Sequence, residues 1–153
     1  MKRSLYVVAL LSIAGCTTQD TQLARQNPST AFAQFSDYPG VLFTAAETTC
    51  SRPYETLIRT SKTKLRCEAL PPPTVMAQII LAYDGTLDDL PRYVLEFSAD
   101  QNPQGYLAKA VFYLDVPQRS GPTIHVKFAD PDLRKNLDRL LEGSGGSLLK
   151  TAP

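Results

Sequence analysis

The chain has 153 residues, enough for one domain of ordinary size, and its 43% hydrophobic and 20% charged residues indicate a folded protein rather than a disordered one. The formal net charge is +1, and without Lys2 and Arg3 the remaining 14 basic side chains are balanced by 15 acidic ones. This balance argues against nucleic-acid binding, which needs a clustered positive excess to displace phosphate counterions.

Residues 1–16 have the parts of a bacterial secretion signal in the expected order. Lys2 and Arg3 form a positive start, the run from Leu5 to Ile13 is mostly apolar, and Ala14-Gly15-Cys16 follows. The apolar run is far shorter than the ~20 residues that a membrane-spanning helix needs. Ile13-Ala14-Gly15-Cys16 resembles the lipobox of bacterial lipoproteins, in which small residues precede an obligatory cysteine. An ordinary secretory signal with an incidental cysteine is the alternative.

The resemblance, which covers residues 1–16 alone, implies that residues 1–15 are removed and that Cys16 becomes the lipid-bearing first residue. A diacylglyceryl group on its sulfur, with acylation by palmitate or a similar chain at the new amino terminus, would hold the protein on a membrane, since each buried methylene contributes ~0.8 kcal/mol. Thr17 replaces the aspartate that commonly retains lipoproteins in the inner membrane. The implied location is the outer membrane facing the periplasm, with the periplasmic face of the inner membrane as the alternative.

Residues 16–40 are rich in Thr, Gln, Ser and Asn and are expected to form a flexible tether, although the segment 31–35 is a possible start of the fold. A single globular, β-rich domain is expected over residues 41–143, followed by a flexible tail over residues 144–153. We find no internal repeat in the sequence.

Period-two patterns dominate the chain from Val41 to Phe128 and predict about six antiparallel strands. Ser61-Lys62 is the expected turn of a hairpin, and Pro71-Pro72-Pro73 should end the pairing because proline offers no N–H. Polar loops are expected at 100–105 and 117–122. The segment 41–45 is a short apolar run, and the expected strands lie in the segments 54–60, 63–69, 75–83, 92–98, 108–116 and 124–128.

The end of the chain predicts a helix over residues 131–142. Asp130 is suited to cap it, Pro131 to its first position and Gly143 to its end. Its leucines form one apolar stripe at positions 133, 137, 140 and 141. The expected fold is therefore α+β, an antiparallel sheet with this amphipathic helix packed on one face. A β-sandwich with a peripheral helix is the alternative.

With Cys16 lipidated, Cys50 and Cys67 remain as an even pair in an oxidising compartment, which favours a structural disulfide. A redox or metal pair would need closer spacing or other ligands. No phosphate loop, zinc spacing or dinucleotide fingerprint occurs in the sequence, so no cofactor and no metal are expected. Asp84, Asp88 and Asp89 are interpreted as a solvated turn rather than a calcium site.

A basic hairpin is the candidate surface for an anionic partner or lipid head groups. It consists of Arg59, Lys62, Lys64 and Arg66, diluted by nearby glutamates, and a solvated hairpin is the alternative interpretation. His125 is the chain's one histidine, so histidine-based catalysis would have to use it. The alternation places its side chain on the exposed side of a strand, where a surface role is favoured.

The favoured functional hypothesis is a non-catalytic, membrane-anchored periplasmic protein that binds an envelope protein partner and no nucleic acid. A ligand-binding module or an inhibitor of a cell-wall hydrolase, acting through the loops 100–105 and 117–122, is the second hypothesis. A hydrolase that uses His125 is the third.

Overall fold

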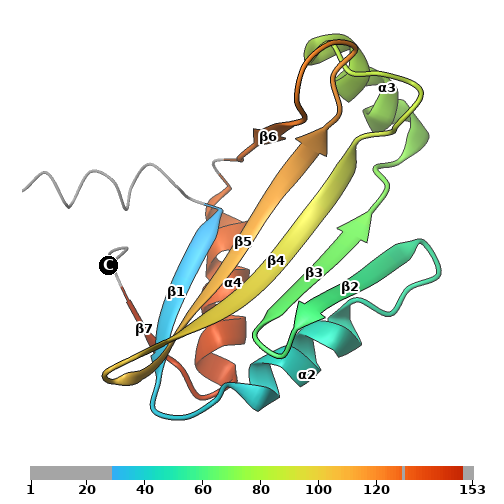
Figure 1. Ribbon diagram of the computed structural model, residues 1–153. Helices are drawn as coiled ribbons and strands as arrows, with labels where there is room; N and C mark the ends of the chain where they lie inside the picture. The colour runs from blue at the N-terminus through green and yellow to red at the C-terminus, as the bar shows by residue number, and fades with distance from the viewer. Residues whose placement is uncertain (1–28, 129, 150–153) are drawn as a thin grey trace, which may run out of the picture.

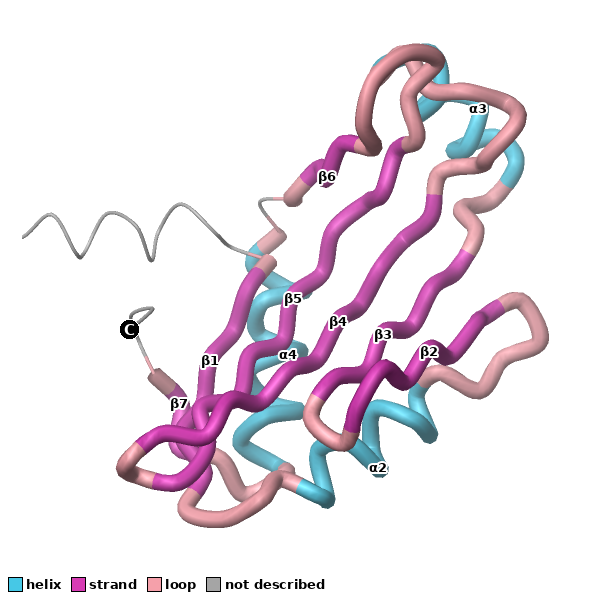
Figure 2. The backbone as a smooth tube through the Cα atoms, viewed as in Figure 1, coloured by secondary structure: helices cyan, strands magenta, loops and turns pink. Residues whose placement is uncertain are grey.

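The computed structural model describes residues 29–128 and 130–149. Within these residues, seven strands form one antiparallel sheet, and three helices accompany it (Figures 1 and 2). The predicted α+β class is confirmed, with an open sheet and a C-terminal helix against one face. No helix in the described part of the chain has the length and apolar character that a bilayer crossing requires.

The sheet has the strand order β2-β3-β4-β5-β1-β7, and β6 also pairs with β5. Two long strands, β4 (Arg92–Asn102) and β5 (Gly105–Val116), run through its middle. β1 (Thr30–Phe35) pairs with one half of β5, and β6 (Ile124–Val126) pairs with the other end of the same strand. β2 (Glu55–Ser61) and β3 (Lys64–Ala69) complete one side, and β7 (Ser147–Leu148) completes the other.

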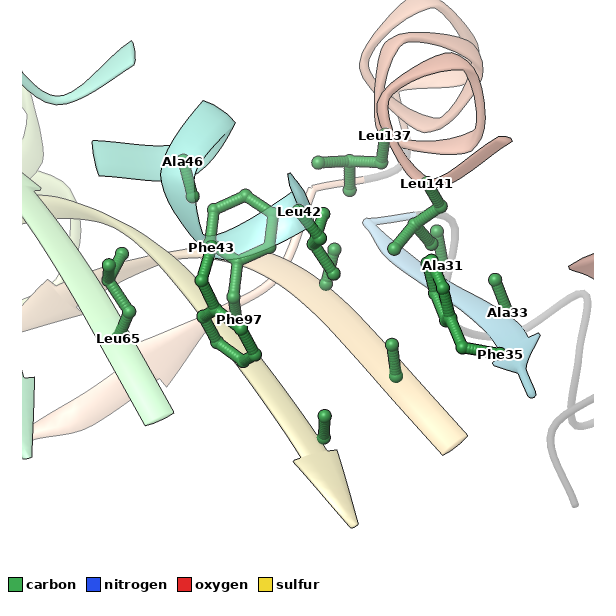
Figure 3. Close-up of a cluster of buried hydrophobic side chains, with 13 residues drawn as sticks. Ala31, Ala33, Phe35, Leu42, Phe43, Ala46, Leu65, Phe97, Leu137 and Leu141 are labelled. Atoms are coloured by element: carbon green, nitrogen blue, oxygen red, sulfur yellow. The ribbon is translucent and has the colours of Figure 1, made fainter. Parts of the chain in front are cut away.

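Two helices, α2 (Gly40–Thr49) and α4 (Pro131–Gly143), cover one face of the sheet and lie behind it in Figure 1. A row of paired residues crosses the strands on this face, in the order Ala31, Ala110, Phe97, Leu65. The small alanines lie beneath α4, where Leu137 and Leu141 occupy the space that they leave (Figure 3). Larger side chains therefore fill the core under α2, where the Phe43 ring lies beside Phe97 and Leu65.

A third helix, α3 (Pro73–Ala82), lies at the far end of β4 and β5 (Figure 1). Its Ile79 packs on Leu114 and Val116 in a separate small cluster, with Tyr93 and Phe128 at the margin. The same two long strands thus carry both cores, one at each end of the molecule.

The N-terminal part of the fold begins before the predicted boundary at residue 41. Residues 30–35, which the sequence assigned to the tether, form β1 inside the sheet, and Ala31, Ala33 and Phe35 are buried. The alternation is weak in the sequence, because the buried Ala31 and Ala33 are small and the bulky, apolar Phe32 between them faces the other side of the sheet. Cys16 and the signal segment lie outside the described residues.

The predicted strand at 75–83 and the apolar run at 41–45, which was included in the β-rich region, are parts of helices. In α2 the buried residues are Leu42, Phe43 and Ala46, and in α3 they are Met76, Ile79 and Ile80. These spacings of one, three and four residues follow a helical period, whereas a strand over 75–83 would have buried alternate residues. The segments are apolar on nearly all sides, so alternation within them carried no information.

The remaining predicted elements are confirmed with small shifts in their bounds. The hairpin β2–β3 turns at 62–63, β4, β5 and β6 lie where alternation predicted strands, and α4 spans Pro131–Gly143. The Asp130 side chain caps α4 by accepting hydrogen bonds from the backbone N–H groups of Asp132 and Leu133, at 2.9 and 3.1 Å.

Two segments that were expected to be loops or tail are more ordered than predicted. The loop expected at 100–105 shrinks to a two-residue turn, because β4 continues to Asn102 and β5 begins at Gly105. The expected tail returns to the sheet as β7, where Leu148 pairs with Ala33. The chain passes close to β1 on its way, since a side chain at Gly146 would meet the Phe35 ring at 2.6 Å.

Candidate functional site

The face of the sheet opposite α2 and α4, here called the open face, carries a network of charged side chains. At its centre Asp115 on β5 is only 7% exposed. One carboxylate oxygen contacts Nδ1 of His125, which the strand register places directly opposite on β6. The other oxygen accepts a hydrogen bond from Nη2 of Arg66, which reaches it from β3. A buried carboxylate is costly unless it is paired, and both partners reduce that cost.

Arg66 and its neighbours cover a small apolar strip on the open face. Val94 and Val111 are buried there although no helix of residues 29–128 and 130–149 lies over them, because long charged side chains extend across the strands. Glu68 lies 2.7 Å from Nε of Arg66 and 3.5 Å from Nε of Arg92. The positive and negative charges of the network therefore mostly pair with one another.

Tyr113 links the two halves of the network. Its hydroxyl donates a hydrogen bond to Glu96 at 3.1 Å, and its ring meets the His125 ring edge-on at a centroid distance of 5.0 Å. Burial and the nearby negative charge of Glu96 raise the pKa of the Tyr113 phenol well above its usual value of 10. The hydroxyl is thus held as a neutral donor.

The four predicted basic residues do not form one surface. Arg59 and Arg66 point to opposite faces of the hairpin, since Arg59 pairs with Leu65 of the core row and Arg66 lies on the open face. Arg59 forms an ion pair with Glu47 of α2 at 2.6 Å and lies over the Phe43 ring. Lys62 and Lys64 are exposed near the turn. The two arginines therefore also make contacts within the chain, and the four basic side chains are divided between the two faces and the turn of the hairpin.

Cys50 and Cys67 form the predicted disulfide, with their Cα atoms 5.7 Å apart. The bridge joins the C-terminal cap of α2 to β3. Glu55 lies next to both sulfur atoms, but sulfur atoms joined in a disulfide are not the thiolates that bind metal. The aspartates of the segment 84–89 turn to separate partners, because Asp84 pairs with Arg119 and Asp89 with Arg92.

An apolar groove of about 360 Å³ lies between α3 and the two segments beside it. Every residue that lines it is apolar, namely Leu70, Pro71, Pro73, Met76, Ala77, Ile80, Leu87 and Leu90. Leu87 is 77% exposed at its edge, and Leu81 on the outer side of α3 is 79% exposed.

The residues of α3 explain why this helix presents apolar surface. The helix begins at Pro73, which suits a first turn, and it contains no charged residue down to Ala82. A helix that is apolar on every side is normally buried. Here one face packs on the sheet, and Leu81 and Ala77 remain in contact with solvent. Exposed apolar side chains beside an apolar groove are typical of an interaction site.

This groove was not predicted, because the pattern of the segment 75–83 was interpreted as a strand. The signal was the absence of charge from Leu70 to Tyr83 together with Pro71-Pro72-Pro73, which favours a helix start as readily as a strand end. His125 is on the exposed side of β6, as the alternation predicted, but its contact with Asp115 could not be read from the sequence. Comparisons with protein-family models, with curated proteins and with solved structures found no match to this chain.

Proposed function

We propose that this chain is a lipid-anchored periplasmic protein of the bacterial envelope, without catalytic activity, that binds a partner protein through the groove beside α3. The anchor rests on residues 1–16, whose last four resemble a lipobox. The disulfide between Cys50 and Cys67 supports an oxidising compartment, since such bridges persist outside the cytosol.

The groove beside α3 is the observation that carries the binding role. Leu81 and Leu87 are almost fully exposed, and covering a leucine side chain completely contributes about 1.5–3 kcal/mol. The groove lining offers no charged group to orient a polar substrate. Its chemistry therefore fits apolar side chains presented by a partner, for example from an amphipathic helix.

The charges around the groove favour a protein segment over a lipid surface. The segment from Asp84 to Leu90 supplies two leucines of the groove and also carries three carboxylates, with no basic residue between them. Asp84 and Asp89 pair with Arg119 and Arg92, which leaves the rim slightly acidic, and anionic phospholipids gain little from such a rim because they attract Lys and Arg. The partner segment we propose has apolar anchors with basic residues beside them.

Site-specific photocrosslinking in intact cells tests this role. A photoreactive residue in place of Leu87 should yield one discrete crosslinked protein, and mass spectrometry should map the link to an apolar segment of that partner. The same residue in place of Lys135, exposed on α4, is the matched control and should not capture it. Ala77→Lys should reduce the yield at position 87 at least tenfold by placing a charge in the groove.

Crosslinks from position 87 to phospholipid, or equal yields from positions 87 and 135, would contradict a protein-binding groove. The anchor is tested separately by metabolic labelling with a fatty-acid probe. The wild-type chain should be labelled and Cys16→Ala should not. An unlabelled wild-type chain in the soluble fraction would remove the anchor and leave the groove experiment unaffected.

A hydrolase is the second candidate, and the pairing of His125 with Asp115 favours it. A carboxylate on Nδ1 orients an imidazole so that its Nε2 faces outward, as in many acid–base catalysts. On this hypothesis, His125→Ala would abolish hydrolysis of envelope substrates while leaving crosslinking at position 87 unchanged. An unchanged phenotype of His125→Ala would remove this candidate.

A further inference from the structure

The outer edge of β2 has no neighbouring strand among residues 29–128 and 130–149. β2 ends the strand order and spans seven residues, Glu55–Ser61. The opposite side of the sheet ends in β7, which has two residues, and β6 has three. Short edge strands are a common protection against unwanted pairing, and β2 lacks it.

The side chains of β2 leave this edge accessible. Residues 56–61 are all exposed, with Leu57 at 40% and Ile58 at 36%. The strand contains no proline, and its one irregularity lies between Arg59 and Ser61, at the end near the turn. An exposed edge with apolar side chains and free backbone groups is a template for another strand.

We infer that two copies of this chain associate through their β2 edges, antiparallel about a two-fold axis, so that their sheets become continuous. A two-fold axis perpendicular to the sheet keeps the helix-covered faces on the same side. Residues that stand opposite must then point to the same face, which restricts the register to even offsets.

Charge selects one register among these. When Leu57 stands opposite Leu57 of the second copy, Glu55 stands opposite Arg59 on both sides of the axis. Opposite charges paired across strands stabilise the pairing. If the two-fold axis passes through Ile58 instead of Leu57, Arg59 stands opposite Leu57 of the second copy. If it passes through Thr56, Arg59 lies outside the paired segment. Both groups keep a partner in their own copy, Arg59 with Glu47 and Glu55 with the backbone N–H of Arg52, so the pairing across the axis adds one further contact to each.

The inference goes beyond the proposed binding role and does not depend on it, because β2 and the α3 groove are different surfaces; only its strength in cells rests on the proposed anchor. A single pair of strands buries less than a stable dimer interface, so the association is weak in dilute solution. Confinement of both copies to one surface would raise their effective concentration.

Disulfide trapping of the full-length chain in intact cells tests the register. In the proposed pairing, Thr56 of one copy stands opposite Ile58 of the other, and opposite Cα atoms in antiparallel strands are about 4.5–5.5 Å apart, within the range of a disulfide. Both residues are on the open face, away from Cys67 and its bridge to Cys50. Thr56→Cys and Ile58→Cys, coexpressed with different tags and oxidised, should give a mixed covalent dimer.

Each variant expressed singly should give at least tenfold less dimer, because two copies of the same position would be offset by two residues along the strand, about 6.7 Å. Thr60→Cys is the exposed control on the same strand, and the wild-type chain measures any background from Cys16. In the mixed experiment, Arg59→Glu in both copies should lower the yield, and Glu55→Arg combined with Arg59→Glu should restore it.

The inference is overturned if no mixed dimer forms while the Cys50–Cys67 bridge remains intact in each variant. Equal yields from the mixed pair, from each single variant and from Thr60→Cys would also overturn it, since they indicate random collision. A mixed yield that Arg59→Glu leaves unchanged would contradict the charge-matched register.

Discussion

At the scale of single residues, the open face shows how a buried charge is maintained in a surface without a covering helix. Asp115 is nearly inaccessible, yet it contacts a guanidinium on one side and an imidazole on the other. Each contact joins a different strand to β5. The network therefore supports the sheet as well as presenting His125 to solvent.

Tyr113→Phe should change how stability depends on alkaline pH. Burial and the charge of Glu96 raise the pKa of the folded-state phenol, so the unfolded chain releases this proton at a lower pH than the folded protein does. The wild-type free energy of unfolding should therefore fall as the pH rises above about 10, and that of Tyr113→Phe should fall less.

At neutral pH the same substitution should cost about 1 kcal/mol, because the hydrogen bond to Glu96 is lost. Urea denaturation of both proteins at a series of pH values between about 7 and 11 measures the two effects. If the free energies of unfolding of the two proteins change in parallel with alkaline pH, the environment of the Tyr113 hydroxyl does not favour its neutral form.

At the scale of elements, α4 and α3 differ in what their leucines contact. Leu141 on α4 is fully buried over the alanines of β1 and β5, whereas Leu81 on α3 is 79% exposed. Leu141→Ala should lower the free energy of unfolding by about 3 kcal/mol, because it leaves a cavity. Leu81→Ala should change it by less than about 0.5 kcal/mol. Denaturant titration of the two variants measures the contrast, and equal losses would contradict the assigned packing.

The elements also show what could be predicted from sequence. α4 was predicted within one residue because a capping aspartate, a proline and a polar–apolar stripe all indicate the same helix. β4 and β5 were found because apolar residues on their helix-covered face alternate with charged residues such as Glu96 and Lys109 on the open face. α3 was wrong because it is apolar on most sides, and period alone cannot separate a strand from a helix there.

The candidate sites followed the same pattern. The disulfide was predictable from cysteine number and compartment, since it needs no knowledge of topology. The groove beside α3 depends on a helix that was assigned as a strand, and the Arg66–Asp115–His125 network depends on strand order across β3, β5 and β6. Contacts between residues 49 positions apart, as for Arg66 and Asp115, have no local signature.

At the scale of the whole molecule, the disulfide ties α2 to the side of the sheet that ends in β2. It joins α2 to β3 across a sequence separation of 17 residues. Replacing Cys50 and Cys67 together by alanine should lower the free energy of unfolding by about 3 kcal/mol, chiefly because the unfolded chain gains freedom. In thermal and denaturant unfolding, the double variant should have the same free energy of unfolding as wild-type protein whose disulfide has been reduced. A loss well below 1 kcal/mol would mean that the bridge adds little to the packing of α2.

The groove beside α3 also bears on how substitutions can change the stability and the binding of this chain. Ala77 lines the groove, so Ala77→Leu would place apolar atoms in space that solvent now fills. Such space-filling changes commonly stabilise a protein by about 0.5–2 kcal/mol, and thermal melting of the variant should show this gain. The same leucine would obstruct an incoming partner. If the variant has a higher melting temperature but a lower crosslinking yield at position 87, the groove lowers the stability of the fold in return for binding a partner.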